Sequence, residues 1–136
     1  MDFVKSIAIA ASGLRTQAGR MRVISENIAN ADSTGQSPGA DPYRRRIPTF
    51  RGEMDRTLDA RVVKLGTVRT DPSQFRNKYE PGHPAADAAG NVKLPNVNAL
   101  IEMADMREAQ RSYEANLNII GATRRMIQRT LDILRG

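Results

Sequence analysis

The chain has 136 residues, a formal net charge of +6, and neither cysteine nor tryptophan. This length suits one domain, and no uninterrupted apolar run is long enough to span a bilayer. Without cysteine, disulfides, thiol nucleophiles and thiolate metal sites are excluded. The charge divides into +2 for residues 1–30, +3 for 31–96 and +1 for 97–136, with acidic residues mixed in throughout. We therefore expect no concentrated basic face and no nucleic-acid partner.

Residues 1–30 are predicted to form a long amphipathic helix. Asp2 is placed to cap it, and apolar residues follow at alternating steps of four and three, which brings them to one side of a helix. A cleaved secretory signal is not expected, because no basic region precedes the apolar run and Arg15 and Arg20 continue the amphipathic pattern. A membrane-surface helix is an alternative, but the small aliphatic face favours packing against protein. The residues that we assign to a helix-pair interface are Val4, Ile7, Leu14, Met21 and Ile28.

Residues 31–96 are predicted to form loops and a small β-rich insert. The segment before Asp41 is rich in Asn, Asp, Gly and Pro, which end a helix and form turns. For the basic run Arg44–Arg46, we favour a solvated or acid-paired loop end over a phosphate or RNA site. Only 13 of the 66 residues are large apolar or aromatic, so the insert has a thin core. β-branched or alternating residues predict short strands at Arg61–Thr70, Phe75–Tyr79 and Val92–Leu94.

Residues 97–136 are predicted to form a second long helix that runs antiparallel to the first. The residues assigned to the interface between the two helices are Met103, Met106, Leu117, Ile120, Ile127 and Leu131. A second apolar row remains, and since one partner helix covers one face, we assign this row to neighbouring subunits. Its members are Ala115, Ile119, Ala122, Met126 and Ile133. The expected fold is mainly α, with the long terminal helices pairing as an antiparallel coiled-coil-like core around the β-rich insert.

Residues able to carry catalysis or bind a metal are scarce. His83 is the single histidine and lies between Gly82 and Pro84, with no ligands around it at metal-binding spacing. No serine or threonine has a second histidine to activate it, and no two acidic residues are placed as an acid–base pair. We therefore predict that the chain is not an enzyme and binds no cofactor, metal or small-molecule substrate.

Five segments form an ordered pattern along the chain. They are Ser25–Asn30 with Thr34-Gly35, Pro42–Arg45, Tyr79–Pro84, Gly90–Met103 and Arg111–Asn116. In this order they resemble the bacterial flagellar axial proteins, the family of rod, hook and hook-associated proteins. Gln36 follows the motif glycine and the aromatic residue comes only at Tyr43, an arrangement that resembles the rod proteins. The family-motif residues are Asn27, Ala29, Asn30, Thr34, Gly35, Tyr43, Pro95, Asn96, Val97, Asn98, Glu102, Met103, Tyr113, Glu114 and Asn116.

The resemblance implies a structural subunit of the proximal rod in the flagellar basal body. It implies that residues 1–30 and 97–136 pair in the inner core of a self-assembling helical tube, with residues 31–96 as a separate module. The rod crosses the periplasm and transmits motor torque to the hook and filament. The implied partners are copies of the chain, other rod proteins, the export-gate adaptor at the rod base and the flagellar type III export apparatus, which uses no cleaved signal peptide. The alternative function is that of a soluble oligomeric coiled-coil interaction protein.

Overall fold

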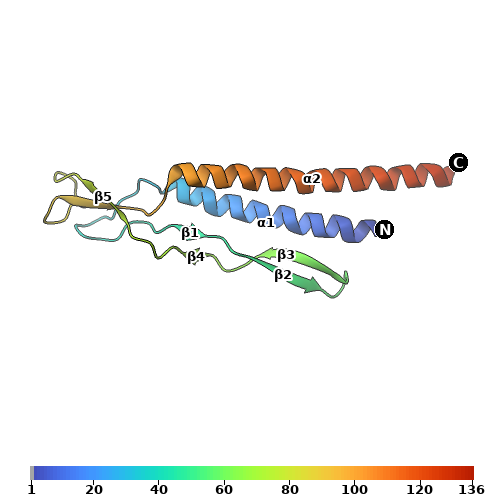
Figure 1. Cartoon of the computed structure of the whole chain (residues 1–136), viewed down its shortest axis with the longest axis horizontal. Coiled ribbons are helices and arrows are strands. Elements are labelled where there is room, and N and C mark those ends of the chain that lie inside the picture. The colour runs from blue at the N-terminus through green and yellow to red at the C-terminus, as the bar shows by residue number, and fades with distance from the viewer. Residues whose placement is uncertain (1) are drawn as a thin grey trace. The chain divides into compact units, whose positions relative to one another are not determined.

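The computed structural model describes residues 2–136, and Met1, the first residue of the predicted N-terminal helix, lies outside them. The chain begins with helix α1 (Phe3–Ala29) and ends with helix α2 (Ala99–Arg135) (Figure 1). Between them lie short strands: β1 (Arg46–Ile47), β2 (Phe50–Asp55), β3 (Ala60–Leu65), β4 (Arg69–Thr70), β5 (Arg76–Tyr79) and β6 (Asn91–Leu94). The predicted fold class, two long terminal helices around a small β-rich insert, is confirmed.

Both helices begin at a side-chain cap. The Asp2 carboxylate accepts a hydrogen bond from the Lys5 amide at 3.1 Å, and the Asn98 side-chain oxygen accepts one from the Leu100 amide at 3.1 Å. Such caps satisfy amides in the first turn, which have no partner within the helix. Glu102 in the first turn of α2 adds negative charge at the positive end of the helix dipole. Within residues 2–136, neither helix has a stretch apolar enough to cross a membrane.

The strands form three separate antiparallel pairs, β1 with β4, β2 with β3 and β5 with β6. The prediction of one strand over Arg61–Thr70 is wrong, because this segment divides at Gly66 between two different partner strands. Gly66 passes so close to Thr49 that an added Cβ would lie 2.6 Å from the Thr49 hydroxyl. The predicted strands near residues 75–79 and 92–94 are confirmed as β5 and β6. Strands β1 and β2 were not predicted.

The chain divides into two compact units, each of which combines parts of both helices with parts of the insert. The first unit contains residues 2–21, 49–67 and 107–136, and the second contains residues 22–48 and 68–106. The predicted division into an inner core of residues 1–30 and 97–136 and a module of residues 31–96 concerns the assembled tube. It stays a prediction.

In the first unit, α1 and α2 approach each other through small side chains. A Cβ on Gly13 would lie 2.7 Å from the Asn116 side-chain oxygen, so the two helices are in close contact at this level. Seven residues further along α1, the Arg20 guanidinium lies 3.4 Å from the Glu108 carboxylate. The contact that comes later in α1 comes earlier in α2, so the two helices run antiparallel. Small buried residues on both helices, such as Ala10 and Ala109, allow this short distance.

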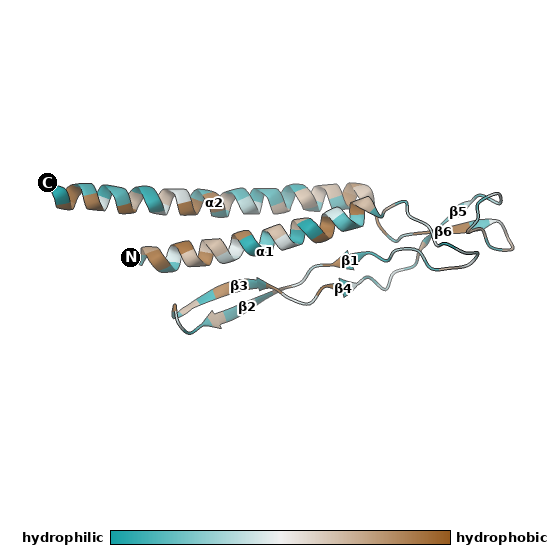
Figure 2. Ribbon diagram, turned by 180° about the vertical axis from the view of Figure 1, so that it is seen from behind, coloured by the Kyte–Doolittle hydropathy of each residue, from teal (hydrophilic) through white to brown (hydrophobic). Residues whose placement is uncertain are grey.

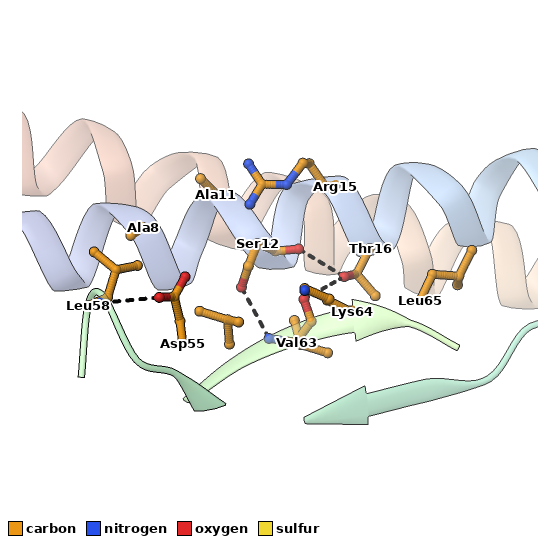
Figure 3. Close-up of a pocket in the computed structure, with 11 residues that line it drawn as sticks. Ala8, Ala11, Ser12, Arg15, Thr16, Asp55, Leu58, Val63, Lys64 and Leu65 are labelled. Carbon is orange, nitrogen blue, oxygen red and sulfur yellow. Dashed lines mark hydrogen bonds between the residues drawn. The ribbon is translucent and has the colours of Figure 1, made fainter. Parts of the chain in front are cut away.

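The β2–β3 hairpin of the first unit is attached to α1 by two hydroxyl groups (Figure 3). The Ser12 hydroxyl accepts a hydrogen bond from the Val63 amide at 3.2 Å, and the Thr16 hydroxyl lies 3.1 Å from the Val63 carbonyl oxygen. These two groups of Val63 point away from β2, where a third strand would otherwise pair with them. The helix therefore takes the place of a strand along this edge. Beside the contact lies an open groove of about 470 Å³.

We expect the substitution Ser12→Ala to loosen this attachment, because the Val63 amide loses its acceptor. A hydrogen bond contributes about 1 kcal/mol net, so exchange of the Val63 amide hydrogen with solvent should accelerate roughly fivefold. Hydrogen-exchange NMR measures this rate directly. The matched control is Ser25→Ala, since Ser25 lies on the same helix with its side chain exposed. Equal exchange rates in the two variants would contradict the assigned role of Ser12.

Candidate assembly interface

A fully buried amide, the side chain of Asn27 near the end of α1, is the centre of a polar network in the second unit. Its nitrogen donates hydrogen bonds to the Arg46 carbonyl at 2.8 Å and to the Glu102 carboxylate at 3.1 Å. Its oxygen accepts from the Tyr43 hydroxyl at 2.8 Å and from the Arg46 amide at 3.0 Å. All four hydrogen-bonding positions of the amide are thereby used. Burial raises the pKa of Tyr43, so its hydroxyl remains a donor.

Glu102, in the first turn of α2, is only 1 % exposed and is paired with Arg45. The Arg45 guanidinium also approaches the carboxylates of Asp71 at 3.4 Å and Asp105 at 3.9 Å. Burial lowers the pKa of Arg45, but its hydrogen bonds and charge interactions with Glu102 and Asp71 outweigh this effect and raise the pKa overall. The guanidinium therefore stays charged. A buried carboxylate of this kind depends on its partners, because an unpaired charge in the interior is strongly unfavourable.

Asn96 joins the network to the turn that follows β4. Its side-chain oxygen accepts a hydrogen bond from the Arg45 amide at 2.7 Å, and its nitrogen lies 2.9 Å from the Ser73 hydroxyl and 3.1 Å from the Asp71 carbonyl. Hydrogen bonds from Ser73, together with Arg45, lower the pKa of Asp71. Four family-motif residues from three of the motif segments, Asn27, Tyr43, Asn96 and Glu102, thus belong to one connected network.

The other motif residues lie in different environments. Pro95 and Val97 are buried on either side of Asn96, and Asn98 caps α2. Asn30 donates to the Glu26 carbonyl at 2.8 Å and so closes the last turn of α1. The half-buried motif residues are Asn30, Thr34, Gly35, Tyr113 and Asn116, and the exposed ones are Ala29, Met103 and Glu114.

The basic run Arg44–Arg46 is paired with acidic and aromatic groups, which confirms the prediction of an acid-paired segment. Arg45 binds the carboxylates described above, and Arg46 lies 3.4 Å from the Glu26 carboxylate. The Arg44 guanidinium lies over the Phe75 ring, 4.2 Å from its centre, a favourable cation–π distance. Sequence reasoning did not include Arg45 or Asp71 among the site residues. The place of Arg45 two residues after the motif aromatic Tyr43 is the signal that was available.

His83 holds a turn together. Its ring nitrogen Nδ1 accepts a hydrogen bond from the Ala85 amide at 3.0 Å, and its own amide donates to the Glu80 carbonyl at 3.0 Å. Both contacts are local, so the ring is accounted for by turn geometry. In the part of the chain that the structure describes, no three His, Asp or Glu side chains are grouped so that they could hold a metal.

The buried positions of α2 are Glu102, Ala109 and Thr123, none of which was predicted for the helix-pair interface. They carry small or paired polar side chains. Close helix contact favours such residues over large apolar ones. Of the predicted helix-pair residues, those half-buried are Ile7, Leu14, Met21, Ile28, Met106, Ile120 and Ile127. Those that the structure leaves exposed are Val4, Met103, Leu117 and Leu131.

The second apolar row of α2 is largely open to solvent. Ile119 is 49 % exposed and Ile133 is 79 % exposed, while Met126 and Ala115 are also exposed and Ala122 is half-buried. Apolar positions recur to the end of the helix (Figure 2), and every residue from 128 to 136 is exposed. Exposed apolar side chains grouped along one helix are unusual on a soluble monomer. This row is therefore a candidate surface for binding another protein.

Replacing Arg45 by Met should leave the Glu102 carboxylate without its ion partner, with only the Asn27 amide as a donor. We expect the free energy of unfolding to fall by about 3–5 kcal/mol, and a second substitution, Glu102→Gln, should recover part of the loss. Urea denaturation measures both effects. The control Arg46→Met breaks a surface pair with Glu26 and should cost at most about 1 kcal/mol. Equal losses in the two single variants would contradict the importance of the buried pair.

The lowered pKa of Asp71 predicts a pH dependence. The pKa of an aspartate in an unfolded chain is about 3.9, so above that pH the ionised Asp71 adds to the free energy of unfolding. The contribution disappears as the pH falls through the lower pKa of the folded state. We therefore expect the stability of the variant Asp71→Asn to depend less steeply on pH below about 4 than that of the unchanged chain. Identical pH profiles from urea titrations would show that the carboxylate makes no such contribution.

Comparison with known proteins places the chain in a family. Residues 7–35 match the family described as flagella basal body rod protein, and residues 88–133 match the C-terminal region of the flagellar basal body rod FlgEFG proteins. The flagellar basal-body rod protein FlgC of Agrobacterium fabrum is 55 % identical over 93 % of this chain and 91 % of its own length. FlgC of Salmonella typhimurium is 37 % identical over 98 % of both chains, and FlgC of Borreliella burgdorferi is 37 % identical over the whole of both. The chain therefore belongs to the FlgC family of flagellar basal-body rod proteins.

Proposed function

We propose that the chain is a structural subunit of the flagellar basal-body rod and that it assembles through its terminal helices into a helical tube. Membership of the FlgC family supports the place of the subunit in the rod. The mode of assembly is supported by one observation above all, the exposed apolar row along α2. The proposed contacts with neighbouring subunits follow from the need to cover this row.

The exposed row needs a partner of matching character. Covering a large aliphatic side chain contributes about 1.5–3 kcal/mol, so several of them along one helix supply a substantial driving force for association. We propose that Ala115, Ile119, Ala122, Met126 and Ile133 contact neighbouring subunits. The same role fits Val4, Met103, Leu117 and Leu131, since each of them is at least 44 % exposed.

The polar network of the second unit gives the subunit the rigidity that a torque-transmitting rod needs. Through Asn27, Arg45 and Glu102, the end of α1, the first strand and the start of α2 are joined by hydrogen bonds and an ion pair. A load applied to one of these segments is therefore carried by the others. We propose that the network helps the rod to pass motor torque to the hook and filament.

We propose as partners copies of the chain, other rod proteins and the export-gate adaptor at the rod base. Export through the flagellar type III apparatus, without a cleaved signal peptide, suits a chain that carries no cysteine and so forms no disulfide before it is exported. The assembled rod would cross the periplasm. In this function the chain is not an enzyme, and it needs no cofactor, nucleic acid or small-molecule substrate.

The double variant Ile119→Asp, Met126→Asp tests the proposal in cells that lack their own copy of the gene. Charges in the apolar row should prevent association, so we expect no rods in isolated basal bodies and no swimming in soft agar. Circular dichroism of the purified variant should match the unchanged chain, because both side chains are exposed. The matched control is Asn118→Asp, an exposed polar position on the same helix, and it should swim normally.

Normal swimming of the double variant would contradict assembly through this row. The alternative function, a soluble coiled-coil interaction protein, predicts a different result. It requires a stable helical oligomer of defined size in solution and no defect in rod formation when the gene is deleted.

A further inference from the structure

The outer edge of β2 has free backbone groups. In an antiparallel pair, successive residues direct their amide and carbonyl groups alternately toward the partner strand and away from it. The Gly66 amide donates to the Thr49 carbonyl at 2.6 Å, so Thr49 faces β3. By alternation, Phe50, Gly52 and Met54 face outward. On the opposite edge of the hairpin, Val63 is bound by the hydroxyls of α1, so the outer edge of β2 points away from the helix.

Within residues 2–136, neither backbone conformation nor a close neighbour explains the glycine in the middle of this strand. Gly52 does not have the positive φ that favours glycine, and an added Cβ would meet no atom within 4 Å. Glycine inside a strand weakens it and often marks a place where another backbone approaches closely. Neither conformation nor space within residues 2–136 requires Gly52, so the backbone for which it leaves room would be that of another chain.

The sequence around Gly52 is complementary to itself when read in the opposite direction. Phe50 and Met54 are equally far from the glycine and are 46 % and 50 % exposed. Arg51 and Glu53 flank the glycine with opposite charges. We propose that β2 pairs with β2 of a second copy of this chain, antiparallel and centred on Gly52, to form a four-stranded sheet.

Backbone geometry agrees with this register. The outward groups of Phe50, Gly52 and Met54 become the hydrogen-bonded pairs of the new ladder, Phe50 opposite Met54 of the second copy and Gly52 opposite Gly52. Arg51 lies opposite Glu53 of the second copy in a non-hydrogen-bonded pair, where side chains are closest. Within its own hairpin Arg51 is opposite Lys64, a like charge. Within the chain Arg51 lies 3.4 Å from the Glu53 carboxylate, and Glu53 of the second copy adds a further carboxylate beside it.

Pairing also stabilises the hairpin itself. A two-stranded hairpin is marginal in water, whereas a sheet of four strands is not. The aromatic ring of Phe50 against the Met54 sulfur of the second copy is a favourable contact. Such a dimer has a two-fold axis, whereas neighbours in a helical tube are related by rotation and translation. The dimer therefore belongs to the subunit outside the tube, and the inference does not depend on the proposed function.

Charge exchange across the two-fold axis tests the register. The substitution Arg51→Glu places two glutamates opposite each other twice per dimer, and within its own hairpin it faces Lys64 and gives up only the exposed pair with Glu53. Sedimentation equilibrium of the purified chain should show a concentration-dependent dimer whose Kd rises about tenfold or more in this variant. The double variant Arg51→Glu, Glu53→Arg restores opposite charges and should restore the dimer. The control Arg56→Glu makes the same charge change in the exposed turn and should leave Kd unchanged.

Disulfide crosslinking through a single introduced cysteine is a second test of the dimer, since the chain has no cysteine of its own. Hydrogen-bonded antiparallel partners have Cα atoms about 5.5 Å apart, within the range of a disulfide. Mild oxidation should therefore crosslink the variant Gly52→Cys into dimers much faster than Gly82→Cys, whose glycine is also exposed and unobstructed. Three results would each overturn the inference. They are an unchanged chain that is monomeric at all concentrations, equal effects of Arg51→Glu and Arg56→Glu, and equal crosslinking of the two cysteine variants.

Discussion

The buried side chain of Asn27 is the interaction on which the second unit depends. It binds both backbone groups of Arg46 as a neighbouring strand would, and it also binds Tyr43 and Glu102. A buried polar network of this type is favourable only when every member has a partner. Arg45 is the ion partner of Glu102. Asn96 binds the Arg45 amide and the Asp71 carbonyl and so connects the network to the turn at Asp71. Removing Asn27 or Arg45 takes a partner from the buried Glu102 carboxylate, and an unpaired buried charge is strongly unfavourable.

Side chains of α1 form hydrogen bonds with backbone groups at the edge of a strand in each unit. Asn27 does so for Arg46 in the second unit, and Ser12 with Thr16 does so for Val63 in the first. Very small sheets otherwise have unpaired edges on both sides, which favour association with other chains. In this fold, side chains of α1 cover two of these edges, whereas the outer edge of β2 has no such cover from α1. This edge and the apolar row of α2 are the two surfaces that we propose for contact with other chains.

The sequence predicted the helices well because capping residues and an apolar repeat are local signals. It did not predict the buried small and polar residues of α2, since the periodicity was read from large apolar residues. The contact in fact uses Gly13, Ala109 and Thr123, which leave little trace in a hydrophobic pattern. Strand β2 was missed because its alternation of Phe50, Gly52 and Met54 with charged residues includes a glycine. The ion pair of Arg45 joins residues far apart in the sequence, and only the fold brings them together.

The central claim is that the apolar row of α2 becomes covered by neighbouring subunits in the rod. Because the chain has no cysteine, single cysteines at Met126 and Ile133 report on that surface without background. The most direct measurement is the rate of thiol labelling at these positions, first in the purified subunit and then in isolated basal bodies. The account predicts rapid labelling in the subunit, where both residues are exposed, and strong protection in the rod. Equally rapid labelling in the assembled rod would contradict it.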